Sequence, residues 1–298
     1  MANIEHLTKL KQGASSWLDW LDRFERPAID LIDANLRGVN LSRIYLVKAN
    51  LQGADLTDTL LSEANLTGAN LQGAELISSD LRQTNLTGAN LRSAYLVDAD
   101  LEQANLIGSD LRSVRGRSAN FRLCNLIGTS MSLAQLRGAN FTQAQLNRAN
   151  LSESALASAS FDLADLSGAS LFETELQSAS FYHANLYRVS AVGSHLAHSY
   201  LVGSNFLEAN LTHCDLRWAN LSYANLQTTN LLQAKLRGTN LTKANLIGAN
   251  LQGANLRGAV FTKANLCQAN LKDADIEDTI FDKANLTRTI MPDGTVHY

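Results

Sequence analysis

The sequence predicts an all-β solenoid, in which the chain winds into a coil around a solid apolar interior. The first observation is a five-residue repeat, A-N-L-x-x, that runs from Leu36 to Leu286 without an insertion or deletion. The second is the spacing of the phenylalanines that replace the repeated leucine, because six of the seven differ by multiples of 20. Four pentapeptides per turn explain this spacing, since every twentieth residue then lies on the same side of the coil.

The five-residue period matches neither a helix, with a period near 3.6, nor a continuous strand, with a period of 2. It fits a short extended piece followed by a bend. Residues two apart in an extended piece share a face, so the leucine and the small residue two positions before it point inward, while the intervening asparagine points outward. Of the 51 central positions, 40 are Leu and 7 are Phe, and 51 divided by four gives about 13 turns. The interior is therefore filled by side chains.

The composition divides the chain into three segments: a helical N-terminal cap at 1–33, the repeat coil at 34–290, and a C-terminal turn and tail at 291–298. A cap is expected because an open sheet edge invites another chain to pair with it. Two central positions hold small residues, Gly116 and Ala191. We expect the coil to collapse locally, to bend or to enclose a water molecule there, because the missing side-chain volume would leave a void.

The N-terminal segment predicts two helices. The first covers about residues 4–11, and Ser15 or Ser16 is the expected N-cap of the second. The second helix has an apolar face with the spacing i, i+3, i+4, i+7, made of Trp17, Trp20, Leu21 and Phe24.

Composition excludes several classes of protein. With 25 basic and 28 acidic residues and a net charge of −3, the chain is neither a polyanion nor a polycation. Three cysteines in 298 residues argue against a disulfide framework and indicate a reducing, cytoplasmic location. The N-terminus lacks the apolar stretch of a secretory signal, and no apolar run reaches the ~18 residues of a membrane span.

The repeated motif resembles that of the pentapeptide-repeat family, whose signature is A-(D/N)-L-x-x. The ends resemble those of cyanobacterial members, with Gly13, Trp17 and Trp20 in a G-x-x-x-W-x-x-W pattern and an M-P-D-G stretch from Met291. This resemblance implies a right-handed quadrilateral β-helix. Most members have no assigned biochemical activity, and the best understood are quinolone-resistance proteins that bind DNA gyrase by mimicking DNA.

The sequence contains no convincing catalytic or metal site. Thr212-His213-Cys214-Asp215 looks like a nucleophile beside its base, but the register points Cys214 inward and its neighbours outward, so they cannot converge on one substrate atom. Four histidines near this segment occupy different register positions, whereas metal ligands must meet about 2 Å from one ion. We therefore expect no enzymatic activity, cofactor, metal or small-molecule substrate.

Charges form bands along the sequence. The net charge of consecutive segments is −7 in 50–111, +6 in 112–148, −5 in 149–187 and +6 in 188–272. A DNA mimic needs a sustained negative surface, because duplex DNA carries one charge per ~1.7 Å of its axis, and the bands interrupt such a surface. One outward column in the last of these segments repeats arginine every 20 residues, which favours an anionic partner: Arg217, Arg237 and Arg257.

Outward apolar residues are concentrated between residues 172 and 232, and the sequence leaves open whether they form one patch or lie scattered over several sides. A contiguous exposed apolar patch commonly marks a binding site. The candidate partner-binding surface consists of Phe172, Tyr182, Tyr187, Val202, Leu207, Trp218, Arg217, Arg237 and Arg257. We predict a rigid, non-enzymatic scaffold that binds another protein through its outer surface and makes no direct contact with nucleic acid. The alternatives are a DNA mimic that binds gyrase or another nucleic-acid-binding protein, and an enzyme, which would need a cleft and convergent polar groups that a close-packed coil does not offer. The same patch could also serve a homodimer.

Overall fold

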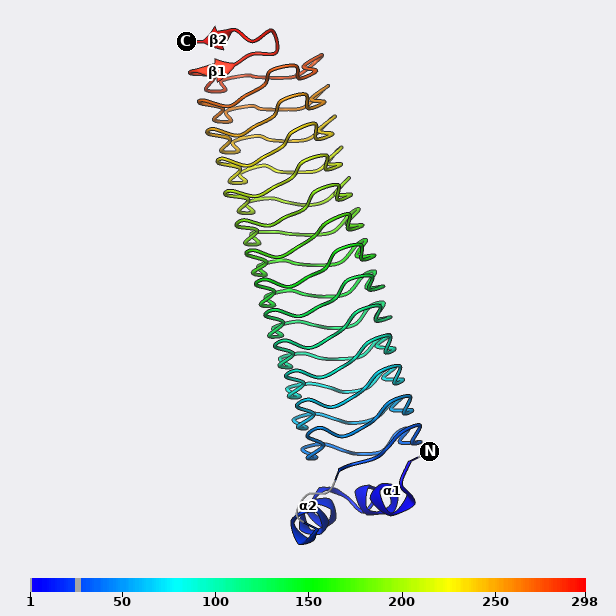
Figure 1. The fold of residues 1–298 in the computed structure, drawn as a ribbon. Helices are drawn as coiled ribbons and strands as arrows, with labels where there is room; N and C mark the ends of the chain where they lie inside the picture. Colours follow the sequence, from blue (N-terminus) through cyan, green and yellow to red (C-terminus); the bar gives the residue numbers. More distant parts are fainter. Residues whose placement is uncertain (1, 25–27) are drawn as a thin grey trace. The chain divides into compact units, whose positions relative to one another are not determined.

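The computed structural model describes residues 2–24 and 28–298 and shows two short helices followed by a regular coil of pentapeptides (Figure 1). Backbone contacts divide the chain into two compact units, Met1–Ala149 and Asn150–Tyr298. The named elements are two helices, α1 (Ile4–Leu10) and α2 (Ala14–Arg23), and two strands, β1 (Thr289–Ile290) and β2 (Val296–His297).

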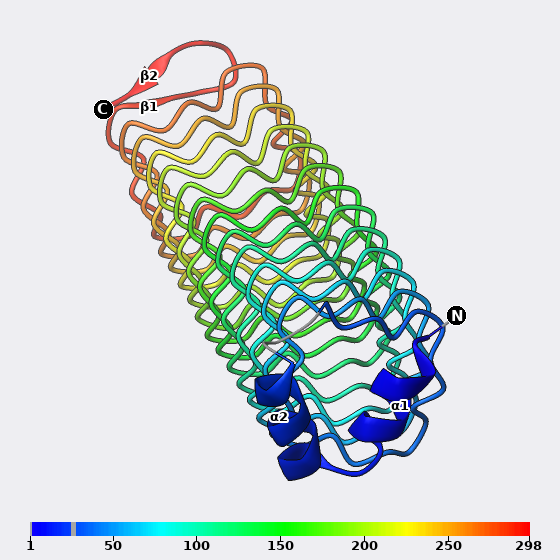
Figure 2. The same cartoon turned by 60° about the horizontal axis from the view of Figure 1, so that its bottom comes forward.

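Each turn of the coil contains four pentapeptides. Parallel bridges join residues 20 positions apart in both units, for example Asn50 to Asn70 and Asn185 to Asn205. At each bridge the strands exchange two backbone hydrogen bonds: in the first unit, Leu71 N donates to Asn90 O at 2.7 Å, and Asn90 N donates to Ala69 O at 2.9 Å. The successive turns therefore stack as a ladder of parallel strands (Figure 2), which confirms the predicted 20-residue period.

The bend of each pentapeptide is a tight turn that starts at the central residue. The carbonyl of Leu71 accepts a hydrogen bond from Ala74 N at 3.0 Å, and the residue between them at the third position, Gly73, has a φ of 67°. A β-turn with a positive φ at that position is of type II, which favours glycine. Asp58 adopts the same conformation, with a φ of 57°, so the repeat imposes the turn on other residues as well.

The interior is a close-packed stack of side chains. Phe121 and Phe141 stack in the first unit with ring centroids 4.8 Å apart, and Phe161 and Phe181 stack at the same distance in the second. Where a threonine replaces the small alanine, its hydroxyl finds a buried acceptor: Thr84 Oγ1 donates to a leucine carbonyl at 2.8 Å. No buried side-chain polar atom of the described residues lacks a hydrogen-bond partner. The predicted apolar interior and phenylalanine stack are confirmed.

The asparagine between the two inward residues stabilises the stack from outside. In the second unit, Asn205 Nδ2 donates to Asn185 Oδ1 at 3.0 Å, and Asn185 Oδ1 also accepts the backbone N–H of Tyr187 at 3.3 Å. One side chain thus links adjacent turns and holds the following bend, which explains why asparagine recurs at this position.

Around Gly116 the neighbouring side chains have closed over the missing volume. A Cβ atom added at Gly116 would lie 2.9 Å from Leu136 Cδ2 and 3.4 Å from Leu96 Cβ. Of the expected outcomes at Gly116, these distances fit a local collapse, and a larger residue there would clash.

The N-terminal helices differ from the prediction in two details. The N-cap of α2 is Gly13, with a φ of 97°, and neither Ser15 nor Ser16 caps it; the chain needs glycine there because it turns sharply between the two helices. Trp17, Trp20 and Leu21 are buried. Phe24 is 55% exposed; it is the C-cap of α2, and its ring packs tilted against Trp20 with centroids 5.4 Å apart.

The helices bond to the first turn of the coil. Trp17 is fully buried, and its Nε1 donates to Tyr45 O at 2.7 Å. The backbone N–H of Asn3 donates to Asp30 O at 3.2 Å. Carbonyl groups at these positions accept from the preceding turn elsewhere in the coil, so the helical segment supplies two donors that a preceding turn would otherwise provide.

The last turn is covered differently. Strands β1 and β2 pair antiparallel, with Thr289 opposite His297 and Ile290 opposite Val296. The central residues of this turn are half-buried, in contrast to the fully buried centres of earlier turns: Ile276, Phe281 and Leu286.

Candidate partner-binding surface

The outward positions of the second unit fall on four sides. We number the sides by their central residues: side 1 contains Phe181, side 2 Leu186, side 3 Ala191 and side 4 Leu196, and each side repeats every 20 residues. The first unit is numbered by the same register, so its side 4 contains Leu56, Leu76 and Leu96.

The predicted surface residues are distributed over all four sides. Side 1 has Tyr182 and Val202, side 2 has Tyr187 and Leu207, and side 3 has Phe172; the remaining four lie on side 4, namely Arg217, Trp218, Arg237 and Arg257. The nine residues therefore do not share one surface, because the length of the turn assigns each register position to its own side. Nearness in sequence had grouped residues that the coil separates.

Side 1 carries a contiguous aromatic cluster. The rings of Tyr182 and Tyr200 stack with centroids 6.0 Å apart, and His183 meets Tyr182 edge-on at 4.3 Å. Tyr182 and Tyr200 are 40% and 45% exposed. The ring of His183 lies against Gly203, where a Cβ atom would come within 2.5 Å of it. Glycine at that corner thus lets the ring lie flat against the backbone.

Tyr223 lies on the same side, one turn beyond Tyr200. It is 57% exposed, and Lys243 Nζ donates to its hydroxyl oxygen at 2.9 Å while lying 4.8 Å from the ring centroid. This hydrogen bond and the positive charge of Lys243 lower the pKa of Tyr223. Lys263 follows at the same register position one turn further on. The aromatic cluster, defined as Tyr182, Tyr200 and Tyr223, therefore has a cationic edge.

Tyr200 and Tyr223 belong to the outward apolar residues between 172 and 232 but were not included among the nine predicted residues. The 20-residue register contains the signal that would have selected Tyr200: positions 180 and 220, which flank it on the same column, hold only Ser and Asn, so a tyrosine there is exceptional. Grouping outward residues by register would have placed both with Tyr182 and Val202.

On side 2 the aromatic residue, Tyr187, packs against a neighbouring side chain of the same side. Tyr187 and Leu207 are half-buried, and the guanidinium of Arg188 lies 4.9 Å from the centroid of the Tyr187 ring. Arg188 also pairs with Glu208 at 2.6 Å. These groups satisfy one another and leave less for a partner than side 1 does.

The arginine column on side 4 is largely neutralised. Arg217 pairs with Asp215 at 2.6 Å, and Arg257 pairs with Glu277 at 2.5 Å. Within the described part of the chain, Arg237 forms no ion pair. The predicted column of mutually repelling arginines thus reduces to one uncompensated arginine, because a carboxylate lies within reach of each of the other two.

The residues that resembled a catalytic group are kept apart. Cys214 is fully buried, its thiol donates to Ala191 O, and burial raises its pKa to about 12. His213 is exposed, and Asp215 is held by Arg217. The described residues contain no group of three or more side chains placed to hold a metal ion. The register argument against a nucleophile and base at this segment is consistent with this arrangement.

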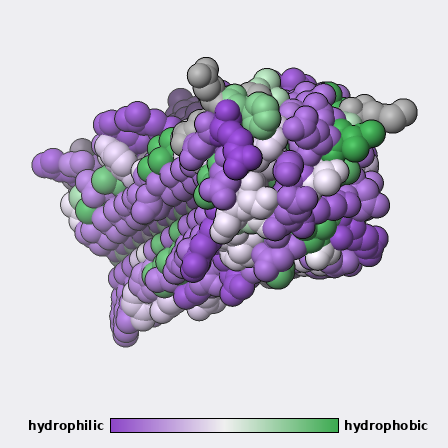
Figure 3. Space-filling view, turned by 90° about the horizontal axis from the view of Figure 1, so that it is seen from below, coloured by the Kyte–Doolittle hydropathy of each residue, from purple (hydrophilic) through white to green (hydrophobic). Residues whose placement is uncertain are grey.

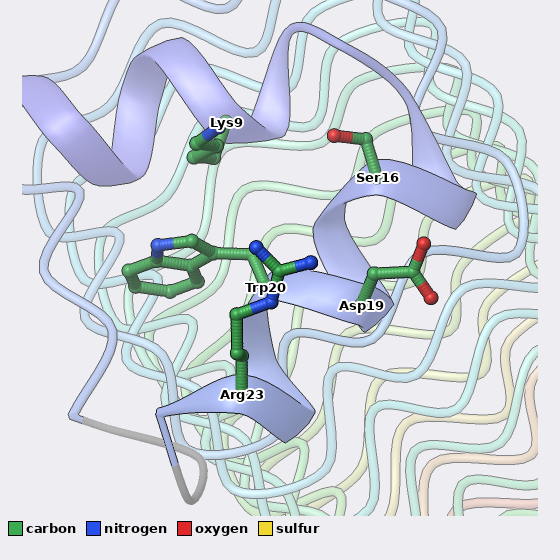
Figure 4. Close-up of a pocket in the computed structure, with 5 residues that line it drawn as sticks. All are labelled: Lys9, Ser16, Asp19, Trp20 and Arg23. Carbon is green, nitrogen blue, oxygen red and sulfur yellow. The ribbon is translucent and has the colours of Figure 1, made fainter.

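A shallow pocket lies beside the helices of the first unit. It has a volume of about 340 Å³; Lys9 reaches it from α1, and α2 contributes Ser16, Asp19, Trp20 and Arg23 (Figure 4). The pocket mixes both charges, and Trp20 is committed to packing against His6 and Trp17. No pair of acid and base groups faces a common point there.

The face seen from the end that carries the helices is mainly hydrophilic (Figure 3). Viewed from the side of the helices, hydrophobic residues form separate spots and narrow bands (Figure 3). Neither helix in the described ranges has the length and apolar character needed to cross a bilayer.

Comparison with known families identifies the repeat. Overlapping matches to the family described as "Pentapeptide repeats" extend from residue 28 to residue 288. The chain belongs to the pentapeptide-repeat family. The fold is accordingly the right-handed β-helix of this family.

Several solved pentapeptide-repeat structures resemble the chain. HetL of Nostoc sp. strain PCC 7120, a protein involved in the regulation of heterocyst differentiation, is 33% identical; the match covers 75% of this chain and 92% of HetL, with a TM-score of 0.40. Full-length QnrB1, a plasmid-mediated fluoroquinolone resistance protein, is 18% identical over 65% of this chain and 92% of its own, with a TM-score of 0.38. A protein of the Arabidopsis thaliana thylakoid lumen is 28% identical over 31% and 61%, with a TM-score of 0.23. No curated protein sequence matches the chain.

Proposed function

We propose that the protein is a non-enzymatic scaffold that binds another protein through the aromatic cluster on side 1. The observation that carries this proposal is that Tyr182, Tyr200 and Tyr223 lie on three successive turns of side 1, with each ring 40% or more exposed and the first two rings stacked. Inward positions are filled by leucine, phenylalanine and small residues, so functional groups are confined to the outward positions and the ends.

The chemistry of the cluster suits a protein partner. Tyrosine and tryptophan dominate interface energetics, because a large rigid ring buries much area at a low cost in side-chain entropy. Lys243 and Lys263 border the cluster, so a partner with an acidic rim would be steered toward it. A regular hydrogen-bonded coil loses little conformational entropy on docking, which lets a modest patch bind specifically.

A DNA mimic is less well supported by the ion pairs. Residues 50–111 contain nine acidic residues. Among the described residues, three of the nine form no ion pair and six pair with arginine: Asp58, Glu63, Asp80, Asp100, Glu102 and Asp110. A surface whose carboxylates are mostly neutralised by neighbouring guanidinium groups does not present the charge density of duplex DNA.

The ends have structural roles in this proposal. We assign residues 1–33 as a cap for the first turn of the coil of residues 34–290. Within this cap, residues 1 and 25–27 lie outside the described residues. We assign residues 291–298 as the turn that closes the other end of the coil. The predicted count of about 13 turns and the cytoplasmic location belong to the same proposal. Cell fractionation with an antibody against the native chain tests the location.

Site-directed photo-cross-linking tests the binding surface. A photoreactive phenylalanine analogue replaces Tyr200 on side 1 or, as a matched control, Tyr187 on side 2. We expect a specific partner to cross-link in native cells from position 200 and not from position 187. If the same partner were captured from both positions, or only from position 187, side 1 would not be the binding surface.

A further inference from the structure

The unpaired acidic residues of the first unit lie on one side. Of the nine carboxylates in residues 50–111, the three without an ion pair in the described structure are Asp55, Glu75 and Asp98, and the register places all three on side 4. Glu75 and Asp98 are exposed, and Asp55 is half-buried. The half-buried side chains of Ile77 and Val97 lie on the same side. We call these five residues the acidic patch.

Side 4 of the second unit has the complementary chemistry. Lys235 and Arg237 are exposed and form no ion pair within the described residues. Trp218 is 56% exposed, and its ring lies over Gly238, where a Cβ atom would come within 2.3 Å of it. We call Trp218, Lys235 and Arg237 the basic patch.

We propose that the acidic patch of one copy binds the basic patch of a second copy. The acidic patch of another copy is a suitable partner for the basic patch, because its charge is opposite, it also contains apolar side chains, and its rows repeat at the same distance. Both patches repeat every 20 residues, so their rows have the same spacing of ~4.8 Å, the distance between hydrogen-bonded strands. This proposal is independent of the aromatic cluster, which lies on side 1.

Antiparallel packing of the two sides brings opposite charges of the two patches together. In that arrangement each position of the pentapeptide faces the same position in the other copy. Glu75 and Lys235 both precede a central residue and therefore face each other, while Asp98 and Trp218 both occupy the corner position. Arg237 then lies opposite Ile77, between the carboxylates of Glu75 and Asp98. The indole of Trp218 is near Val97. Two unpaired cations thus meet two unpaired carboxylates around an apolar contact.

The contact is expected to be weak and sensitive to salt. Each patch covers only a few turns, which is typical of small, transient interfaces. The charges lie at the surface, where the screening length falls from about 30 Å at 0.01 M salt to about 3 Å at 1 M. Neighbouring pairs such as Arg217 with Asp215 remain within each copy.

Sedimentation velocity at low salt tests the proposal with charge-reversal variants. We expect reversible self-association of the natural chain, weakened by salt, and a loss of about tenfold or more in the association constant for K235E/R237E, because like charges then face each other. The combined variant E75K/D98K/K235E/R237E restores opposite charges across the contact and is expected to recover the association.

The matched control is K263E/K272E, which changes the net charge by the same amount at exposed lysines on sides 1 and 3. This control is expected to associate like the natural chain. A natural chain that stays monomeric at low salt, a control that loses association as fully as K235E/R237E, or a combined variant that fails to recover would overturn the proposal. Melting temperatures show that each variant is folded.

Discussion

The inward and outward positions of the same pentapeptide obey different rules. Leu226 and the residues that stack above and below it on side 2 are fully buried apolar groups, whereas the next residue, Gln227, lies on a column that also holds Tyr187, Leu207 and Ile247. The inward column tolerates little beyond leucine and phenylalanine, because the neighbouring turns fix its volume. The outward column varies freely, so differences among outward residues record function while the inward ones record the fold.

A buried charge gives the largest expected effect. Leu226→Asp places an unpaired carboxylate among apolar side chains and should cost about 3 kcal/mol or more in the free energy of unfolding. Gln227→Asp makes the same change one residue later and should change stability by less than about 0.5 kcal/mol. Chemical denaturation of the two variants measures both. Equal losses would mean that the assignment of inward and outward positions is wrong.

The helical end gives an intermediate effect. Trp17→Phe keeps most of the buried ring but removes the donor to Tyr45 O, leaving that carbonyl without its partner at a cost of about 1–3 kcal/mol. Trp20→Phe is the control, since its Nε1 bonds to the exposed side chain of Glu5, and it should cost less. Hydrogen exchange of the backbone amides in the first turns of the coil measures the difference in stability between the two variants. Protection that is unchanged in Trp17→Phe would argue against a capping role of this bond.

Two adjacent threonines provide a smaller contrast. The inward Thr229 donates its buried hydroxyl to Phe206 O at 2.7 Å, and the outward Thr228 donates to Gln227 O at the surface. Thr229→Val should cost about 1 kcal/mol, because the shape is kept and one buried hydrogen bond is lost. Thr228→Val should cost clearly less, since water replaces the lost partner. A thermal melt of each variant measures the two losses of stability. A larger loss in Thr228→Val than in Thr229→Val would contradict the assignment of inward and outward positions.

Acid sensitivity gives the smallest expected effect. Hydrogen bonds from Arg112 hold the pKa of Asp110 below its usual range. A carboxyl whose pKa is lower in the folded state stabilises the fold above its ordinary pKa and loses that contribution as the pH falls through the lowered value. Asp110→Asn should therefore reduce stability slightly at pH 7 and hardly at all in strong acid.

Asp98→Asn, at a carboxylate without an ion pair, is the comparison for the acid experiment. A low protein concentration keeps self-association out of this measurement without screening the pair between Asp110 and Arg112. A difference between Asp110→Asn and the natural chain that persisted unchanged into strong acid would show that the pair with Arg112 is not its source.

The regular part of the molecule was predictable and its exceptions were not. The five-residue period and the phenylalanine spacing determined the coil, because every inward position is constrained by two neighbouring turns. The N-cap was mispredicted because the backbone at Gly13 requires a positive φ that no sequence pattern had indicated. The arginine column was misjudged because Arg217 bonds to Asp215 within its own pentapeptide, a local contact that counting by columns ignores.

The surface could be predicted only in part. Aromatic residues were recognised as outward and concentrated between residues 172 and 232, but grouping them by nearness in sequence mixed all four sides. The stacking of Tyr182 on Tyr200 depends on the turn length of 20 residues, since the two positions lie 18 apart and meet on adjacent turns. Which side binds a partner depends on such contacts between turns.

The inward positions carry the fold, and we propose that the side 1 aromatic cluster carries the function. The most direct test combines Tyr182→Ala, Tyr200→Ala and Tyr223→Ala in one chain and measures its melting temperature together with its capture of the native partner. The double variant Tyr187→Ala and Leu207→Ala serves as the control on side 2. We predict that the triple variant keeps its melting temperature and loses capture, while the control retains both. A triple variant that still captures the partner at full strength would contradict the account.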